Sequence, residues 1–434
     1  MRQFLLLIFT CLIAACGAPK KIEQTILSAE EITRIHKNTL ILDSHIDIPL
    51  EYMGEIDPSG DARLQADLQK LDAGGVDVAF LIVYTPQGAL DTAEAYEEAW
   101  GISVKRSQAI HKFLEKYEHR VELARTVADT RRIVESGKKA ILIGWENAYP
   151  LTLCGSDHEY NLKIFGKASD KRDCGKQILE IKAGAHYVGL THFGHNQFAD
   201  SSNPHPQRDK NRPRHNGVSE QGRDLIKTLN KFGIMVDVSH ASKASMMQAA
   251  DLSTTPIIAS HSGAKAIGDH PRNLDDEQLR KIAAIGGVAQ MVAFDAYVKP
   301  FTSEQKAFQK SLREELGLET ADKRRSASEE VKAEYKERIK AIWDIKPRAT
   351  IADFVDHIDH AVKVAGINHV GIASDFDGGG GLDGWEDASQ TANVTAELLR
   401  RGYSEGDIAK IWGENLLRVM AAAQSAAQSH KTGQ

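Results

Sequence analysis

The feature that most constrains the fold is a series of eight short apolar runs, separated by segments such as Glu122–Gly137 and Gly222–Phe232 that have helical spacing. The runs are rich in Val, Ile and Leu and mostly lack polar alternation, as expected for strands buried on both faces of a parallel sheet. Eight strands that alternate with helices predict an α/β fold, a (β/α)8 TIM-like barrel. The predicted strands are Thr39–Asp43, Val76–Tyr84, Ala140–Trp145, Tyr187–Thr191, Gly233–Val238, Pro256–Ser260, Gly287–Phe294 and Val370–Ser374.

The chain has 434 residues, which is long for one domain, but such barrels reach this length when their loops are extended. Two polar stretches, Cys154–Lys176 and His195–Asn216, are longer than ordinary connections and are typical of functional walls or lids. A third stretch, Ser303 to about Ile345, is dense in Lys, Glu and Arg and indicates a solvated helical insertion. We therefore expect one catalytic domain over residues 25–425, followed by a flexible tail over 426–434.

The charge balance argues against a nucleic-acid partner. Lys and Arg number 54 against 60 Asp and Glu, the net charge is −6, and no sustained basic stripe occurs. Proteins that bind the phosphate backbone normally show such a stripe. With 42% apolar and 26% charged residues, the composition is that of a globular protein and excludes a multi-span membrane protein.

The first sixteen residues form the exception. An apolar run from Phe4 to Ala15 follows Arg2 and is too short to span a bilayer comfortably, so it predicts a secretory signal. The run ends in Ala-Ala-Cys16, which resembles a bacterial lipobox in which the cysteine is lipidated. A plain signal peptide cut elsewhere is the alternative. We expect an exported, membrane-anchored lipoprotein with a linker over residues 17–24, and Gly17 after the cysteine favours the outer membrane.

Two further cysteines, Cys154 and Cys174, bracket a polar stretch. An exported protein tolerates disulfides, so a bond between the two is the preferred interpretation, and two unpaired thiols are the alternative. No CxxC spacing occurs, which argues against metal ligation by these thiols.

Chemistry-bearing side chains gather at the ends of the predicted strands. Catalytic residues of a (β/α)8 barrel lie at the carboxyl ends of its strands, and six of the eight ends here carry a titratable or metal-binding group. Chance would not place four of seventeen histidines there. The residues are His45 and Asp47, Glu146, His192, His240, His261, and Asp375 with Asp377.

Five of these residues form a candidate metal site. His45 and Asp47 are two apart on a strand and therefore project to one face, where imidazole and carboxylate suit zinc or a similar metal. His240 and His261 supply a second imidazole pair, and the two oxygens of Glu146 can bridge two ions. Each motif alone has an ordinary explanation, a surface turn or a core histidine. Together they predict a binuclear site that activates a bridging water.

Other histidines carry weaker signals. His357 and His360 have the spacing of a ligand pair, but their helix carries an apolar stripe, so we expect both to face solvent or the edge of the stripe. His195, His205 and His215 lie in the long polar stretch after the fourth predicted strand, and no specific feature assigns them to the pocket.

Seven motifs, in this order, carry a family resemblance: HIDIP, GWEN, LTH, DVSH, SHSGA, HPRN and SDFDGG. From about Leu42 to Val419 the chain resembles the membrane (renal) dipeptidase family of zinc peptidases. The resemblance implies a TIM-like barrel, two zinc ions per chain, hydrolysis of dipeptides and a homodimer. It also implies roles for eight residues: His45 and Asp47 as ligands of one zinc, His240 and His261 of the other, Glu146 as the bridge, His192 and Arg272 as substrate contacts, and Asp375 as the acid/base.

Alternatives remain for three of these roles. His192 has the alternative of a structural histidine that bonds backbone carbonyls, and Arg272 that of pairing with Asp275 or Asp276. Strand phase does not decide between Asp375 and Asp377; the resemblance favours Asp375 and leaves Asp377 to hold the glycine-rich turn.

One departure from the family lies beside the bridging carboxylate. Asn147 stands where the family often has glycine, and Asn tolerates unusual backbone angles better than most residues. The ligand geometry should therefore survive. The charged insertion and the Cys154–Cys174 stretch also depart from the family and concern specificity rather than chemistry.

The expected activity is dipeptide hydrolysis by a metal-activated water. His192 would stabilise the oxyanion, Asp375 would carry the proton to the leaving amine, and Arg272 would bind the terminal carboxylate. One alternative is the same site cleaving another amide or lactam, or a cell-wall fragment that contains a D-amino acid. Another is a lipoprotein that binds peptides without turnover, which would have no need of Asp375.

Overall fold

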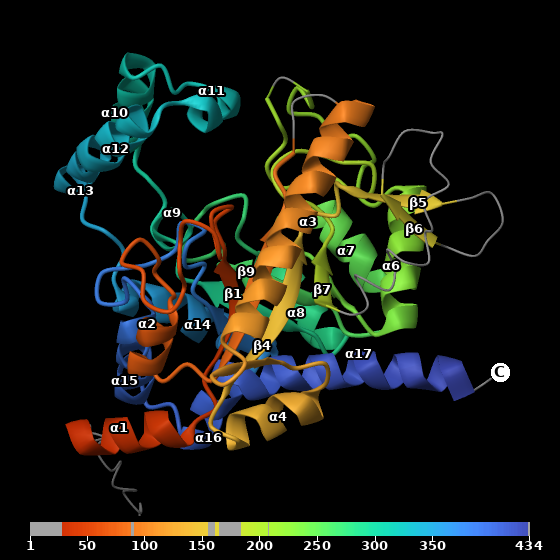
Figure 1. Cartoon of the computed structure of the whole chain (residues 1–434), viewed down its shortest axis with the longest axis vertical. Coiled ribbons are helices and arrows are strands. Elements are labelled where there is room, and N and C mark those ends of the chain that lie inside the picture. Colours follow the sequence, from red (N-terminus) through yellow and green to blue (C-terminus); the bar gives the residue numbers. More distant parts are fainter. Residues whose placement is uncertain (1–27, 88–90, 155–160, 165–183, 207, 433–434) are drawn as a thin grey trace, which may run out of the picture.

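Eight parallel strands form the centre of the structure, a computed structural model that describes residues 28–87, 91–154, 161–164, 184–206 and 208–432 (Figure 1). They pair in the order β1-β2-β4-β7-β8-β9-β10-β11, and each overlaps one predicted strand. All eight predicted strands are therefore confirmed. Their bounds are β1 (Leu42–Asp47), β2 (Val78–Tyr84), β4 (Lys139–Glu146), β7 (Ala185–Gly189), β8 (Met235–Asp237), β9 (Ile258–Ser262), β10 (Val288–Val292) and β11 (Val370–Ala373).

The sheet closes through the segment that follows β11. The amide of Asp375 donates to the carbonyl of His45 at 3.1 Å, and the amide of Asp47 donates to the carbonyl of Phe376 at 2.9 Å. Ile46 and Phe376 form an isolated parallel bridge. The result is a nearly closed barrel, which confirms the predicted TIM-like fold.

The first strand begins later than its apolar run suggests. Thr39, predicted to start the strand, instead ends α1, and β1 continues through the polar residues as far as Asp47. Pairing with β2 joins Ile46 to Leu81 and Asp47 to Ile82. His45 and Asp47 are consequently fixed by the sheet itself rather than by a loop.

One predicted helix divides into two elements. The start of Glu122–Gly137 forms a short strand, β3 (Val121–Leu123), which pairs with β4. Helix α4 (Val127–Glu135) begins only after Thr126, whose hydroxyl accepts from the amide of Asp129 while the Asp129 carboxylate accepts from the amide of Thr126. This capping box sets the start of the helix. The predicted Gly222–Phe232 helix is confirmed as α6 (Glu220–Phe232).

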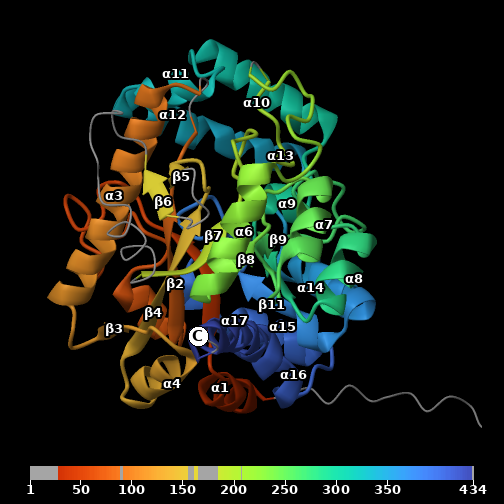
Figure 2. The same cartoon turned by 90° about the vertical axis from the view of Figure 1, so that its right-hand side faces the viewer.

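The remaining helices surround the strands or extend beyond them (Figures 1 and 2). Their bounds are α1 (Ala29–Asn38), α2 (Leu68–Ala73), α3 (Ala93–Lys116), α7 (Lys243–Leu252), α8 (Asp276–Ala284), α9 (Asp295–Val298), α14 (Ile351–Ala365), α15 (Ala392–Arg400), α16 (Glu405–Ala409) and α17 (Asn415–Thr432). None of the described helices is both long and apolar enough to span a bilayer.

The last helix closes one end of the barrel. In Figure 1, α17 lies across the amino ends of the strands, and its Leu416 and Met420 belong to the same buried cluster as Leu42 and Phe80. The expected flexible tail over 426–434 is helical as far as Thr432, because Ala427 packs against the barrel beside Gly233. With this end filled, the carboxyl ends of the strands are left to build a site.

The long stretch after β4 contains more regular structure than expected. β5 (Leu151–Cys154) ends where the predicted loop Cys154–Lys176 begins, and it pairs antiparallel with β6 (Asn161–Ile164) inside that loop. Cys174 and residues 1–27, with Cys16, lie outside the described residues, so the disulfide and the lipidation stay predictions.

The charged insertion over 303–345 is helical, as predicted. It comprises α10 (Ser303–Glu315), α11 (Ala321–Ser326), α12 (Glu329–Arg338) and α13 (Ile342–Ile345), which stand apart from the barrel at the top of Figures 1 and 2. Helix α12 has no buried residue, consistent with a solvated element.

Candidate active site

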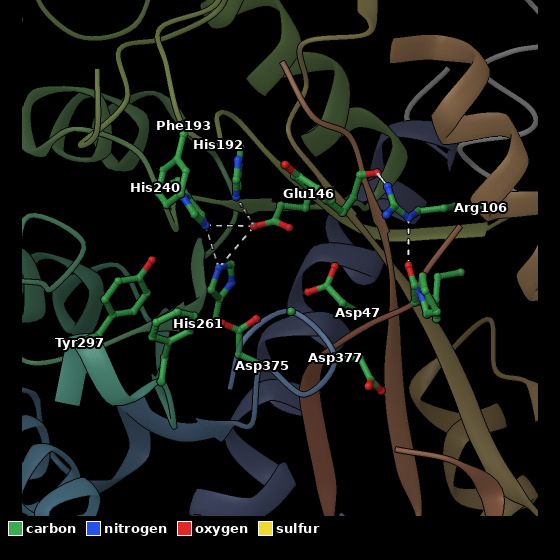
Figure 3. Close-up of a pocket in the computed structure, with 15 residues that line it drawn as sticks. Asp47, Arg106, Glu146, His192, Phe193, His240, His261, Tyr297, Asp375 and Asp377 are labelled. Atoms are coloured by element: carbon green, nitrogen blue, oxygen red, sulfur yellow. Dashed lines mark hydrogen bonds and ion pairs between the residues drawn. The ribbon is translucent and has the colours of Figure 1, made fainter. Parts of the chain in front are cut away.

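A cavity of about 320 Å³ opens at the carboxyl ends of the strands (Figure 3). Its wall combines carboxylates and imidazoles with aromatic rings and one arginine. The lining residues are Asp47, Ile48, Pro49, Tyr84, Arg106, Glu146, His192, Phe193, His240, His261, Phe294, Tyr297, Asp375, Asp377 and Gly378.

His45 and Asp47 lie side by side, as their spacing on β1 predicts. His45 Nε2 is 3.4 Å from Asp47 Oδ2. On the other side of the ring, Nδ1 is 3.0 Å from the hydroxyl of Tyr187, which itself donates to the carbonyl of Ser44. The hydroxyl proton of Tyr187 is already donated to Ser44. The hydrogen bond between His45 and this hydroxyl must therefore be donated by Nδ1, which carries the ring proton. The tautomer directs the Nε2 lone pair toward the carboxylates, as in metal-binding histidines.

Glu146 ends β4 at the centre of the cluster. Its Oε1 is 3.0 Å from His240 Nε2 and 3.4 Å from His261 Nε2, while its Oε2 is 3.7 Å from His45 Nε2. The two oxygens thus face different histidines, as a bridging carboxylate requires. Asn147, which follows, has φ of 78°, confirming that this position needs a residue tolerant of the left-handed region.

The electrostatics around Glu146 favour its ionised form. Burial by itself would raise the pKa of this carboxyl, but the neighbouring imidazoles of His192, His240, His261 and His45 hold it well below its usual range. A permanently ionised carboxylate among histidines is suited to a cation.

His240 and His261 form the second pair of imidazoles. Their Nε2 atoms are only 2.9 Å apart. His261 Nδ1 lies 2.9 Å from the hydroxyl of Ser260, which donates to the buried carboxylate of Asp237 at 2.7 Å. Because that hydroxyl proton is committed, Nδ1 of His261 is the donor and its Nε2 is left with a lone pair. Burial first, and then the nearby cations, lower the pKa of both histidines well below its usual value.

This donor set fits metal ions. Ligand atoms fall into three overlapping groups, each within 4.8 Å: His45 with Glu146 and His261; Glu146 with His192 and His240; and His45 with Asp47 and Asp375. His45 Nε2 is buried without a hydrogen-bond partner. Although burial opposes it, Asp47 and Glu146 raise the pKa of His45 well above its usual value, so this position favours a positive charge. Neutral imidazoles and carboxylates converging on shared positions are typical of zinc and similar metals.

The turn after β11 separates the roles of its two aspartates. Both have a left-handed backbone, with φ of 58° at Asp375 and 61° at Asp377. Asp377 accepts from the amides of Gln65 and Ala66 at 2.7 and 3.2 Å and so holds the turn, as predicted. Glycine is required at Gly378, because a Cβ there would overlap the carboxylates of Asp47 and Asp375.

Asp375 belongs to the metal-binding cluster. Its Oδ1 is 3.9 Å from His45 Nε2. Burial raises the pKa of the Asp375 carboxyl well above its usual range, and the negative charges of Asp47 and Glu146 add to this effect against the opposing His45. Cations bound at the neighbouring ligands would lower that pKa again. A carboxyl with so tunable a pKa is suited to proton transfer.

The ring of His192 faces the cavity. Its Nε2 is 3.8 Å from Glu146 Oε1, and the ring packs against Tyr84 and His240 with centroids 4.7 and 4.2 Å away. Within the described residues its ring makes no hydrogen bond to a backbone carbonyl, which favours a place in the site over the structural alternative.

Arg272 lies behind the wall of the cavity. Arg272 is 2% exposed, and its guanidinium donates to the carbonyl of His261 at 2.9 Å and lies over the ring of Tyr297 at 5.4 Å. It lines an adjoining cavity of about 80 Å³ that shares His240 with the main one, and its Nε is buried without a partner. Arg272 does not pair with the acidic segment after it. Asp275 pairs instead with Lys243, and Asp276 with His360 and Arg280.

The other histidines serve the fold. His357 is buried, where its Nδ1 accepts from the amide of Ala264 and its Nε2 contacts the carbonyl of Val298. Of the two expected positions, solvent or the edge of the stripe, the solvent position is wrong for His357, because the apolar stripe is wide enough to include it. The rejection of the pair as ligands agrees with the described clusters, which contain neither. His195, His205 and His215 do not line the main cavity.

Sequence reasoning missed several cavity residues, among them Arg106, Phe193 and Tyr297. Arg106 comes from the middle of α3 and Tyr297 from the short α9. Neither lies at a strand end, and no local motif marks either one. Phe193 directly follows His192 and is 45% exposed, which is unusual for a large apolar side chain.

Comparisons with known proteins agree with this geometry. Residues 29–160 and 177–434 match the family model described as Membrane dipeptidase (Peptidase family M19). Dipeptidase tcpJ of Claviceps purpurea is 29% identical over 378 residues, which cover 86% of this chain and 73% of tcpJ. Dipeptidase verJ of Clonostachys rogersoniana is 28% identical over 407 residues, 90% and 86% of the two chains. A crystal structure of the probable dipeptidase PvdM from Pseudomonas aeruginosa is 33% identical with a TM-score of 0.76, covering 92% of this chain and 98% of that one.

Proposed function

The chain belongs to the membrane dipeptidase family (Peptidase family M19) and is a hydrolase acting on dipeptides, and we propose that its site holds two zinc ions. The observation that carries the proposal is the convergence of three imidazoles on the two oxygens of Glu146. His45 and Asp47 would hold one ion, His240 and His261 the other, and Glu146 both. When bound, the ions would polarise the scissile carbonyl and lower the pKa of water in the cavity.

Two residues of the chain then act on the proton of the attacking water and on the negative charge that develops on the carbonyl oxygen. Asp375 would accept a proton from the attacking water and return it to the leaving amine, a general acid–base role supported by its place beside His45 and Asp47. His192, whose ring faces the cavity, would donate a hydrogen bond to the oxygen that becomes negative.

Arg272 would attract the terminal carboxylate of the substrate. Its Nε has no partner, and its charge lies close enough to lower the pKa of His192, His240 and His261. Tyr297 stands between this guanidinium and the cavity, so the charge would act from behind the ring. A charge fixed at one side of the scissile bond favours dipeptides over longer chains, whose carboxylate lies too far away.

The test is hydrolysis of a dipeptide panel by the purified chain, with L,L and L,D pairs and with Ala-Ala amide, which lacks the terminal carboxylate. We expect turnover of at least one free dipeptide, much weaker turnover of the amide, complete loss on chelation and recovery when zinc is returned. Turnover that persists after exhaustive removal of metal would overturn the proposal. Equal rates for Ala-Ala and its amide would remove the carboxylate role from Arg272.

We also propose that the enzyme is exported and held at a membrane through lipidated Cys16. The support is the apolar run Phe4–Ala15 followed by this cysteine. Cells given labelled palmitate should label the chain, and Cys16→Ser should abolish the label. Equal labelling of the variant would rule out this anchor.

A further inference from the structure

Arg106 is a cation in the wall of the cavity that the mechanism does not use. It projects from α3, and two of its guanidinium nitrogens are anchored to strand ends: Nε donates to the carbonyl of Ile48 at 3.0 Å and Nη1 to that of Tyr84 at 2.6 Å (Figure 3). These bonds fix the orientation of the guanidinium next to the cavity.

Arg106 is held in place by hydrogen bonds to neutral groups. Its hydrogen-bond partners are neutral carbonyls, and among the residues described no carboxylate lies within ion-pair distance of it. The third guanidinium nitrogen of Arg106, Nη2, makes no hydrogen bond to any residue that the structure describes. A half-buried guanidinium with a donor to spare is suited to an anionic ligand that enters the cavity. The nearby carboxylates of Asp47 and Glu146 are directed to the metal-binding cluster instead.

Arg106 and Arg272 flank the cluster from different directions. Arg106 is tied to the ends of β1 and β2, whereas Arg272 contacts β9 through the carbonyl of His261 and lies against Tyr297. In Figure 3, Arg106 and Tyr297 lie at opposite sides of the cluster, with Glu146 and Asp47 between them. A dipeptide with its terminal carboxylate on the Arg272 side therefore has its N-terminal residue on the Arg106 side.

We propose that Arg106 is a specificity-determining residue that selects dipeptides whose N-terminal residue carries a side-chain carboxylate. The inference rests on the proposed function and adds the class of substrate. An acidic side chain would accept a charge-assisted hydrogen bond from Nη2, whereas its amide isostere offers a neutral oxygen only.

The experiment compares kcat/KM for Glu-Ala with Gln-Ala, and for Asp-Ala with Asn-Ala. The acidic member should be favoured by about tenfold in the unaltered enzyme, as expected for a hydrogen bond between charged groups. Arg106→Gln should bring both ratios close to one, and Arg106→Lys should give intermediate ratios. Dissociation constants of phosphinate mimics of Glu-Ala and Gln-Ala, measured by calorimetry, should follow the same order.

A matched control is Lys105→Gln, which removes an exposed cation from the same helix and should leave both ratios unchanged. Ratios near one in the unaltered enzyme would overturn the inference even if Arg106→Gln failed to fold. An Arg106→Gln enzyme that keeps the original ratios would also overturn the inference. This includes a variant in which kcat/KM falls equally for the acidic and the amide dipeptides. Hydrolysis of neutral dipeptides without acid preference would leave the proposed function intact, whereas no hydrolysis of any dipeptide would refute the proposed function.

Discussion

Asp375→Asn is expected to lower kcat for dipeptide hydrolysis by about 10²–10⁴-fold, the range that general acid–base catalysis contributes. The amide keeps the size and shape of the side chain but cannot accept the proton of the attacking water. Because His45, Asp47, Glu146, His240 and His261 stay in place, the metal content per chain should change little. Loss of turnover with metal retained would separate proton transfer from metal binding.

The control for this variant is Asp377→Asn, two residues along the same turn. Asp377 also borders the cavity and also has a left-handed backbone, but its carboxylate accepts from the amides of Gln65 and Ala66. We expect a much smaller loss of kcat, accompanied by lower thermal stability. Turnover of Asp375→Asn equal to that of the unaltered enzyme would contradict the role assigned to Asp375.

Glu146→Gln is expected to remove the metal as well as the activity. Glutamine offers one carbonyl oxygen and an amide NH2 group that can only donate, so it cannot serve two ions, and the ionised centre among four histidines is lost. Metal content should fall below two ions per chain, and kcat/KM should fall by more than about 10³-fold, since metal-assisted catalysis contributes several kcal/mol.

The measurement is elemental analysis of the purified variant beside kcat/KM for one dipeptide. Glu122→Gln provides the control, because this glutamate lies on β3 and pairs with Arg132 at the surface, where such a pair contributes about 0–1 kcal/mol. It should keep both metal and activity. A Glu146→Gln enzyme with full metal content and ordinary turnover would mean that Glu146 does not bridge the ions.

The barrel and its ligands could be predicted because both leave local signals. Strands buried on both faces appear in the sequence as short apolar runs, and the residues that end such strands lie together at one end of a parallel barrel. His45, Glu146 and His261 are far apart in sequence, yet strand order alone brings them together. The different contacts of Asp375 and Asp377 needed the structure, since the alternation of side chains along a strand does not continue into the turn.

Other features depend on packing that no local pattern records. Arg106 reaches the cavity because the long helix α3 crosses the ends of β1 and β2. Arg106 lies far in sequence from the strand-end motifs, so no motif predicts this contact. Arg272 could be assigned by motif, but its position behind Tyr297 could not. His357 can be buried within the apolar stripe because a backbone amide and a backbone carbonyl satisfy the two nitrogens of its ring.

The most direct test of the central claim is a zinc titration of the metal-free chain, with dipeptide hydrolysis recorded at each addition. The ligand set predicts that activity rises from zero and reaches its maximum at two zinc ions per chain, with no further gain beyond that ratio. Full activity at one ion per chain, or with none, would contradict a binuclear centre built on Glu146.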